Sequence, residues 1–150
     1  MKVVVTTECS APPEVAFAAH IDIPNWPRFL SDIKKIDILT AGPIAIGMRF
    51  RLTRLVRGRR TIGELKLAAM EAPWRLVFSA VEDGLRRIVT SEMVPNGSGS
   101  RLTLSYEAIP LTFAARLRSL LSFRSAGGAR RQLRGDIADL AHEAERRVRG

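Results

Sequence analysis

The sequence predicts an α+β domain in which about seven antiparallel strands form a sheet that curves around a long C-terminal helix, with two short helices after the first strand. Apolar and polar residues alternate from Leu102 to Ala108, as in a half-buried strand. Short turn sequences separate successive apolar runs, which indicates antiparallel neighbours because parallel strands need long crossovers. From Leu133 to Val148 the apolar residues fall at helical spacing instead.

The chain opens with a β-branched run, Val3 to Glu8, that leads directly into a short helix. Ser10 is the expected N-cap of this helix, because serine is a favoured cap and the prolines after it are tolerated in a first helical turn. The helix is expected to end near residues 20–22. A second short helix should follow, with Trp26 and Phe29 on one apolar face, either as packing residues or as residues at a portal.

From Ile33 onward the apolar period changes to two, and turn sequences divide the stretch into strands, with Asp83-Gly84 as a strong signal of a two-residue hairpin. Phe50 and Leu52 should point inward, so the arginines beside them should point outward. We therefore expect a basic exterior flank on this hairpin, formed by Arg49, Arg51, Arg54, Arg57, Arg59 and Arg60. An anionic membrane surface and an acidic partner are equally good candidates for what it meets.

The C-terminal part is expected to form one helix of about 20 residues, which spans roughly 30 Å. Its apolar stripe must bury against the sheet. The tetrapeptide 125–128 is expected to interrupt the chain before this helix, and no internal repeat or second domain is apparent, so residues 1–150 read as one ligand-binding domain.

Composition excludes several classes of function. The formal net charge of +9 comes from 20 Arg and 4 Lys against 15 acidic residues, and in this Ala- and Gly-rich chain it indicates a solvated basic surface rather than a nucleic-acid site. No apolar run approaches the ~20 residues that span a bilayer, and no signal peptide is visible, so a cytoplasmic location is expected. Cys9 is the only cysteine, which excludes an intrachain disulfide and a cysteine-based metal site.

Several segments carry a resemblance to a known family: residues 10–17 (SAPPEVAF), 23–29 (IPNWPRF), 42–50 (GPIAIGMRF), 71–76 (EAPWRL) and 133–145 of the last helix. Together with the order of elements, they resemble the START-like (SRPBCC) superfamily, and within it the polyketide cyclase/dehydrase and lipid-transport branch. The resemblance covers nearly the whole chain and implies the helix-grip fold. It also implies a cavity between sheet and helix, which relatives use for lipids, sterols, quinones, plant hormones or polyketides.

The ligand-binding residues are therefore expected where the inward positions of the strands meet the apolar stripe of the helix, with further contacts from the second short helix and from the segment after the last strand. This set comprises Trp26, Phe29, Phe50, Leu52, Leu67, Phe78, Leu104, Tyr106, Phe113, Leu117, Ile137, Leu140 and Ala141. Tyr106 has a hydroxyl that could bind a ligand carbonyl or be satisfied within the protein. His20 could act as a base or as a cation at a helix end.

No catalytic residue, cofactor site or metal site is predicted, because the sequence has no nucleophile elbow, phosphate loop or dinucleotide motif and its His and Cys residues are far apart. A carrier or binding protein for a hydrophobic small molecule is the first hypothesis. A cyclase or aromatase type of enzyme is the alternative, and an interaction module whose interior is filled by its own side chains is the third.

The segment from Leu111 to Arg124 departs from the family in length and composition, and it leaves the shape of the cavity mouth open. Its apolar residues, Phe113, Leu117, Leu120 and Leu121, share one helical face, and Arg116, Arg118 and Arg124 are added to them. Such a helix can lie on an anionic membrane. We expect either a mobile lid that touches membranes transiently, with residues 125–128 as its hinge, or a helix packed on the sheet or on a second subunit.

Overall fold

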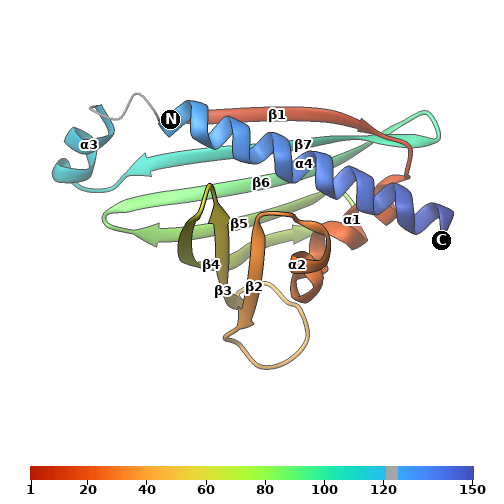
Figure 1. The fold of residues 1–150 in the computed structure, drawn as a ribbon, viewed down its shortest axis with the longest axis horizontal. Coiled ribbons are helices and arrows are strands. Elements are labelled where there is room, and N and C mark those ends of the chain that lie inside the picture. The colour runs from red at the N-terminus through yellow and green to blue at the C-terminus, as the bar shows by residue number, and fades with distance from the viewer. Residues whose placement is uncertain (121–124) are drawn as a thin grey trace.

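The computed structural model describes residues 1–120 and 125–150, with the side chains of residues 119, 120, 125 and 126 left out of the description. It confirms the α+β helix-grip architecture (Figure 1). In chain order the elements are β1 (Lys2–Cys9), α1 (Pro13–Ile21), the 3₁₀ turn η1 (Ile23–Asn25), α2 (Trp26–Phe29), β2 (Ile33–Ile38), β3 (Arg49–Val56), β4 (Arg59–Glu71), β5 (Arg75–Glu82), β6 (Leu85–Asn96), β7 (Gly99–Pro110), α3 (Phe113–Leu120) and α4 (Ser125–Arg149).

The seven strands form one antiparallel sheet in the order β1-β7-β6-β5-β4-β3-β2. Six of them follow one another along the chain and pair in that order, and β1 closes the far edge beside β7. The turn between β5 and β6 has positive φ at both Asp83 (53°) and Gly84 (72°), the backbone that a type I′ hairpin requires. The hairpin predicted from this dipeptide is therefore confirmed.

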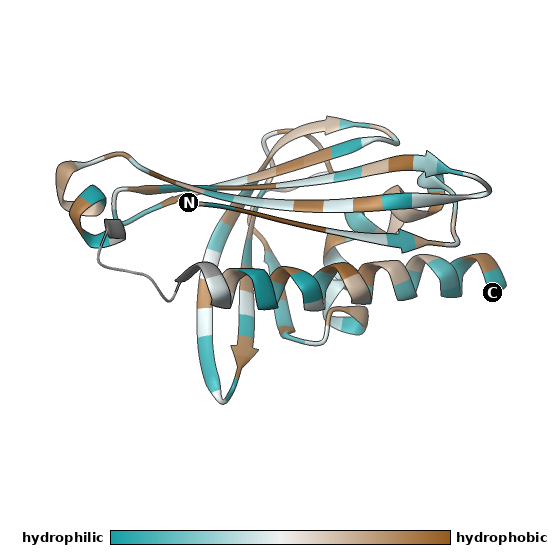
Figure 2. Cartoon of the chain, turned by 90° about the horizontal axis from the view of Figure 1, so that it is seen from above, coloured by the Kyte–Doolittle hydropathy of each residue, from teal (hydrophilic) through white to brown (hydrophobic). Residues whose placement is uncertain are grey.

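The sheet divides into two wings between β4 and β5. These strands pair only from Lys66 with Ser79 to Glu71 with Arg75, so residues 59–65 of β4 have left the edge of β5. Seen from above, the β3–β4 hairpin runs past α4 and ends beyond it, away from the wing that contains β1 and β5–β7 (Figure 2). Helix α4 packs mainly on β1 and β7 of that wing, and the β3–β4 hairpin is tied to α4 by the hydrogen bonds of Arg54 to Asp136.

Helix α4 is the central packing element. Its buried stripe lies against the sheet and α1, and it consists of Leu133, Ile137, Leu140, Ala141 and Ala144. The helix has 25 residues, more than the 20 expected, because it begins at Ser125. The expectation that residues 125–128 interrupt the chain before this helix is wrong, because they form its first turn. A hinge at these residues stays a prediction.

Two other expectations are corrected by contacts with α4. Ser10 does not cap α1, whose N-cap position is Pro12; instead its backbone N–H and its hydroxyl both donate to Glu145, at 2.9 and 3.1 Å. Arg54 does not belong to the basic exterior. It is 9% exposed and donates two hydrogen bonds to Asp136 of α4, each 3.1 Å long. Both residues tie the sheet to the helix.

Among the described residues, no helix combines the length and apolar character needed to cross a bilayer.

Candidate functional site

The candidate site is the concave face of the sheet, opposite α4. Strand register defines which residues face it: Leu104 lies beside Val5 and Ser91, and Tyr106 lies beside Val3 and Val89. Leu104 is buried and Tyr106 is partly buried against the core. The inward orientation predicted for both from alternation therefore agrees with the structure, while their contact with a ligand stays a prediction.

The part of this face next to α2 is filled by aromatic side chains. The rings of Trp26, Phe50 and Phe78 pack edge to face, with centroids 5.5 to 5.9 Å apart. The indole N–H of Trp26 donates to the backbone oxygen of His20 at 3.2 Å, which fixes the ring. Trp26 is thus a packing residue at the closed end of the site, and Phe50 and Phe78 complete the same plug.

Several other predicted contacts also belong to the packed core. Leu67, Ile137, Leu140 and Ala141 are between 0 and 7% exposed and join one apolar cluster with the aromatic plug. Ordinary core packing explains their burial, and their contact with a ligand stays a prediction.

The opposite half of the concave face is less covered. Leu52, Leu65, Val89 and Tyr106 come from four different strands, point inward and are only partly buried. Leu52 lies opposite Gly63 on β4, and a Cβ at Gly63 would meet no atom within 4 Å. We call these four partly buried side chains, two on each wing of the sheet, together with the space beside Gly63, the open half.

Small residues widen the open half, and sequence reasoning missed them. Gly63, Ala80 and Ala108 all occupy inward positions, as their register with Leu52, Arg87 and the core residues shows. The signal was present in the sequence: each is a small residue at an inward position of an alternating strand. At the rim Arg87 and Glu82 also face inward, and their side chains are 3.7 Å apart.

The hydroxyl of Tyr106 is the one side-chain polar group among the four residues of the open half. Within the part of the chain that the structure describes, no hydrogen bond reaches this hydroxyl. A phenol in an apolar setting gains from a partner, so it is available to a ligand oxygen.

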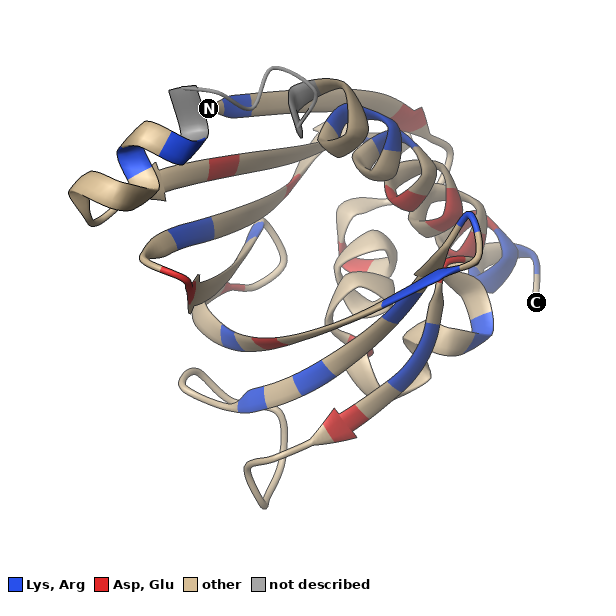
Figure 3. Cartoon of the chain, turned by 60° about the vertical axis from the view of Figure 1, so that its left-hand side comes forward, with Lys and Arg blue, Asp and Glu red and all other residues tan. Residues whose placement is uncertain are grey.

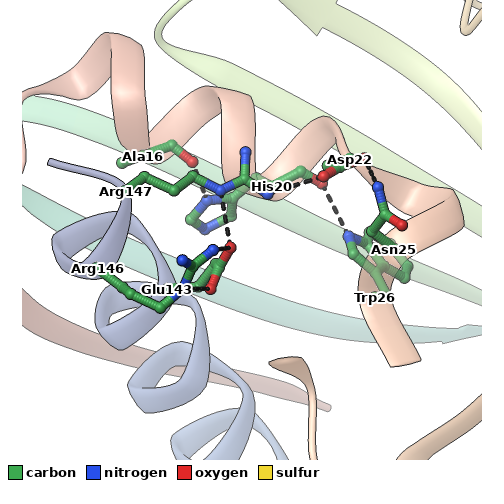
Figure 4. A network of polar contacts seen from close by, with 8 residues as sticks. All are labelled: Ala16, His20, Asp22, Asn25, Trp26, Glu143, Arg146 and Arg147. Atoms are coloured by element: carbon green, nitrogen blue, oxygen red, sulfur yellow. Dashed lines mark hydrogen bonds and ion pairs between the residues drawn. The ribbon is translucent and has the colours of Figure 1, made fainter. Parts of the chain in front are cut away.

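His20 is the second candidate polar group, and it lies deeper, on α1 (Figure 4). Its Nδ1 is 2.6 Å from the backbone oxygen of Ala16, a distance that places the proton on Nδ1 and leaves Nε2 as an acceptor. Nε2 is buried and has no partner among the described atoms. Burial lowers the pKa of His20 to about 4, so the ring is neutral near pH 7 and is not the helix-end cation that was considered.

The C-terminal turns of α4 close the α2 end with an ionic network (Figure 4). Glu143 accepts hydrogen bonds of 2.8 to 2.9 Å from Arg146 and Arg147, which lower its pKa to about 2. Arg147 also donates to Asp22 at 2.8 Å and lies 5.6 Å from the ring centre of Phe29. Phe29 is therefore partly buried under a guanidinium at the outer side of the plug.

Helix α3 presents the side chains of Phe113 and Leu117 to solvent. Thr112 caps the helix by accepting from the N–H of Ala115 at 3.0 Å, and Ala115 packs beside the β5–β6 turn. Phe113 is 75% exposed and Leu117 is 47% exposed. As ligand contacts these two stay a prediction, and the proposed roles of Leu120, Leu121 and Arg124 fall outside the described side chains.

Among the described residues, no group of three or more His, Cys, Asp or Glu side chains could hold a metal ion. Cys9 is buried, and burial raises the pKa of its thiol, so the thiol is a poor nucleophile near neutral pH.

Comparison with solved structures gives full-length matches at low identity. The Zhui aromatase/cyclase of Streptomyces sp. R1128 is 17% identical with a TM-score of 0.78, over 99% of this chain and 95% of that one. The protein TTHA0849 of Thermus thermophilus is 19% identical with a TM-score of 0.74, over 96% and 97%. Major latex-like protein 151 of Panax ginseng is 12% identical with a TM-score of 0.72, over 96% and 97%.

No protein-family model and no curated protein matches the chain by sequence, so the similarity lies in the fold. The likeness is not confined to one motif, because each match extends over nearly the whole length of both chains. These structural neighbours are members of the START-like (SRPBCC) superfamily, and this protein has the superfamily's helix-grip fold.

Proposed function

We propose that this protein binds a hydrophobic small molecule, such as a lipid, a quinone or a polyketide-like compound, between the sheet and α4, and that it acts as a carrier or binding protein. The observation that carries the proposal is the open half of the concave face. Leu52, Leu65, Val89 and Tyr106 are all largely apolar, inward-facing and incompletely covered, although they adjoin a fully packed core. Binding sites of this kind combine an apolar lining with a few polar anchors.

The ligand lies with its apolar part against these four side chains, with one end toward the aromatic plug and the other toward the rim at Glu82 and Arg87. A carbonyl or hydroxyl of the ligand bonds to the Tyr106 hydroxyl. The small side chains at residues 63, 80 and 108 leave the space that the ligand occupies, since a larger residue at any of them would extend into the open half.

Native mass spectrometry of gently purified protein tests this proposal. A co-purified molecule is expected in the wild type and lost in Ala108→Trp, which fills the open half from β7. The matched control is Ser105→Trp, because Ser105 is on the same strand and faces the other way. Equal ligand content in both variants, or an empty wild type that also fails to bind added fatty acids and quinones, would favour the interaction module without a ligand.

An enzyme of the cyclase or aromatase type is the second candidate. One structural neighbour is described as an aromatase/cyclase, and the open half holds an uncommitted hydroxyl, with the unpartnered Nε2 of His20 deeper in the same core of the described chain. In such a reaction the pocket folds a poly-β-keto chain, and positioning supplies much of the rate enhancement. The wild type is incubated with a panel of poly-β-keto substrates. Turnover that is lost in both Tyr106→Phe and His20→Ala would support the enzyme, whereas binding without turnover would support the carrier.

We infer further that α3 brings the protein to anionic membranes when ligand enters or leaves. Phe113, Leu117 and Leu111 are exposed on or beside a short helix at the end of the molecule where the rim lies, and α3 is anchored there by Arg118, which donates to the backbone oxygen of Asp83 at 2.7 Å. Exposed apolar side chains combined with cations gain from contact with anionic lipid.

Co-sedimentation with phosphatidylglycerol vesicles and with phosphatidylcholine vesicles tests this role. Phe113→Ser combined with Leu117→Ser should weaken binding to the anionic vesicles, because it removes the contribution of α3. Val4→Ser combined with Val94→Ser, which removes two exposed valines elsewhere on the surface, should not. A dimer in which α3 packs on a second copy predicts instead that the first double variant changes the mass in solution and leaves sedimentation unaffected.

A further inference from the structure

The division of the sheet between β4 and β5 creates a second concave site, whose mouth is on the side away from the core. A pocket of about 520 Å³ lies at this division. Its outer walls come from β3, β4 and β5 and include Arg49, Arg51, Ile62, Lys66, Ser79 and Val81. Alternation separates these side chains from the inward-facing Phe50, Leu67 and Phe78, so they belong to the outer face. We call this pocket the β4–β5 slot.

The base of the slot lies at the sheet itself. Gly63, Leu65 and Ala80 contribute to it, and the same three residues border the open half from the other face. The slot and the open half therefore lie on opposite faces of the sheet. Along each strand, alternate side chains point toward one face or the other. What distinguishes the slot is the chemistry of its outer walls.

The slot gathers positive charge at one end. Arg49 and Lys66 are direct cross-strand neighbours, with Cβ atoms about 5 Å apart in such a pair. Like charges placed opposite each other destabilise a sheet, and Arg51 adds a third cation on the diagonal. Figure 3 shows cationic bands along neighbouring strands of this wing.

The acidic residues at the slot do not neutralise this charge. Glu64 is the cross-strand neighbour of Arg51 but reaches Arg49, at 3.8 Å, with both side chains of that ion pair largely exposed. Glu82 is occupied by Arg87 at 3.7 Å. Arg51 and Lys66 make no ion pair or side-chain hydrogen bond with any described residue. An anion placed among the three cations would relieve their repulsion and gain charge-assisted hydrogen bonds.

The other end of the slot is apolar. Ile62 and Val81 are 58% and 64% exposed, which makes them two of the most exposed large aliphatic side chains of the described residues. Ile62 is four residues from Lys66 along β4, a distance of roughly 13 Å at the rise of an extended strand. An amphiphile of that length would meet cations at one end and apolar surface at the other.

We propose that the β4–β5 slot binds an anionic amphiphile, with its carboxylate or phosphate head among Arg49, Arg51 and Lys66 and its short apolar chain on Ile62 and Val81. This site is distinct from the one proposed for the interior ligand, because the side chains that would hold the two molecules point to opposite faces of the sheet. The shared chemistry admits a free molecule or the head group of a lipid in a bilayer.

Titration of the ¹⁵N-labelled protein with octanoate tests the site. Octanoate should shift the backbone amides of Glu64 and Ser79, and octanol, which has the same chain without charge, should not. Arg51→Gln combined with Lys66→Gln should weaken octanoate binding by about tenfold or more, because two charge-assisted contacts are removed. Salt should weaken binding in the wild type as well.

Two variants serve as controls. Arg59→Gln combined with Arg60→Gln removes the same charge from the same hairpin outside the slot and should leave the affinity unchanged. Ser79→Trp fills the slot from β5 without entering the core and should abolish the shift at Glu64. Octanoate that moves only the amides of Val89 and Tyr106 would overturn the slot while supporting the interior site, so the two proposals fail separately.

A second arm separates the two sources of the anion. Phosphatidylglycerol vesicles are mixed with protein that carries Phe113→Ser and Leu117→Ser, so that α3 makes no contribution. If Arg51→Gln and Lys66→Gln abolish the remaining sedimentation, and the protein does not bind octanoate, the slot is assigned to a lipid head group. If the two substitutions change neither octanoate binding nor vesicle binding, the proposal is overturned.

Discussion

The two ends of the concave face differ in how completely the chain covers them. At the α2 end, three aromatic rings, a buried histidine and the Glu143 network close the space between the wings. In the open half, apolar residues of four strands are only partly covered, and the sheet itself divides between β4 and β5. The same fold thus combines an end that is closed by packing with an end whose apolar side chains are less covered.

This difference follows from residue size at inward positions. Along β5 the inward side chains change from Leu76 and Phe78 to Ala80, and along β4 they change from Leu67 to Gly63. Large residues bring the wings into contact with the core, while small residues leave them apart. The comparison predicts that substitutions at the α2 end mainly lower stability, whereas substitutions in the open half mainly lower ligand binding.

The largest effect is expected for Phe50→Ala, which removes the ring at the centre of the aromatic plug. Truncating a buried Phe costs about 3–5 kcal/mol of unfolding free energy. Leu65→Ala, on the neighbouring strand in the open half, should cost much less because Leu65 is already partly exposed. Urea unfolding measures both, and similar losses would show that the two ends are packed alike.

Leu140→Ala tests whether the stripe of α4 is core. Leu140 is 5% exposed, and its truncation should cost about 2–5 kcal/mol. Leu117→Ala on α3 is the matched change at an exposed leucine and should cost less than about 0.5 kcal/mol. A loss below about 1 kcal/mol for Leu140→Ala would show that the helix does not depend on this contact.

His20 makes the closed end sensitive to pH. Its pKa is lowered from 6.5 to about 4, so between these values the unfolded chain binds a proton that the folded protein does not. Stability is therefore highest above pH 6.5 and falls as the pH drops to 4, by about 3 kcal/mol. His20→Gln should remove this part of the pH dependence in urea unfolding between these two pH values.

Glu143 provides an internal control for that measurement. Its pKa is lowered to about 2, so its contribution is present above its ordinary value of 4.5 and is lost as the pH falls toward 2. The two windows hardly overlap. A profile that is unchanged by His20→Gln above pH 4.5 would contradict the assignment of a neutral buried histidine.

Sequence reasoning recovered the fold because alternation, hairpin signals and helical spacing are local properties. Asp83-Gly84 and the alternation around Tyr106 needed no partner to be interpreted. The errors concern contacts between distant segments: Ser10 bonds to Glu145, and Arg54 bonds to Asp136, 82 positions away. Alternation from Phe50 and Leu52 does place Arg54 on the inward face, but the local pattern does not show that Asp136 is there to accept its hydrogen bonds.

The candidate site was recovered only in part for the same reason. Alternation identified the inward direction of Leu52, Leu104 and Tyr106, but it does not indicate which inward residues pack against one another. The aromatic plug joins α2, β3 and β5, and the division of the sheet depends on where β4 and β5 stop pairing. Both are properties of three-dimensional packing.

The smallest expected effect on stability, and the most direct test of the open half, is Tyr106→Phe. The hydroxyl has no partner among the described residues, so its removal should change the unfolding free energy by less than about 0.5 kcal/mol. If the hydroxyl anchors the ligand, the same change should weaken binding by about tenfold, the effect of one lost hydrogen bond in an apolar site. The measurement is the affinity for whichever molecule co-purifies with the wild type, alongside urea unfolding of the empty protein. A variant that binds normally but unfolds more easily would mean that the hydroxyl serves the protein's own packing, and the open half would then lack its central anchor.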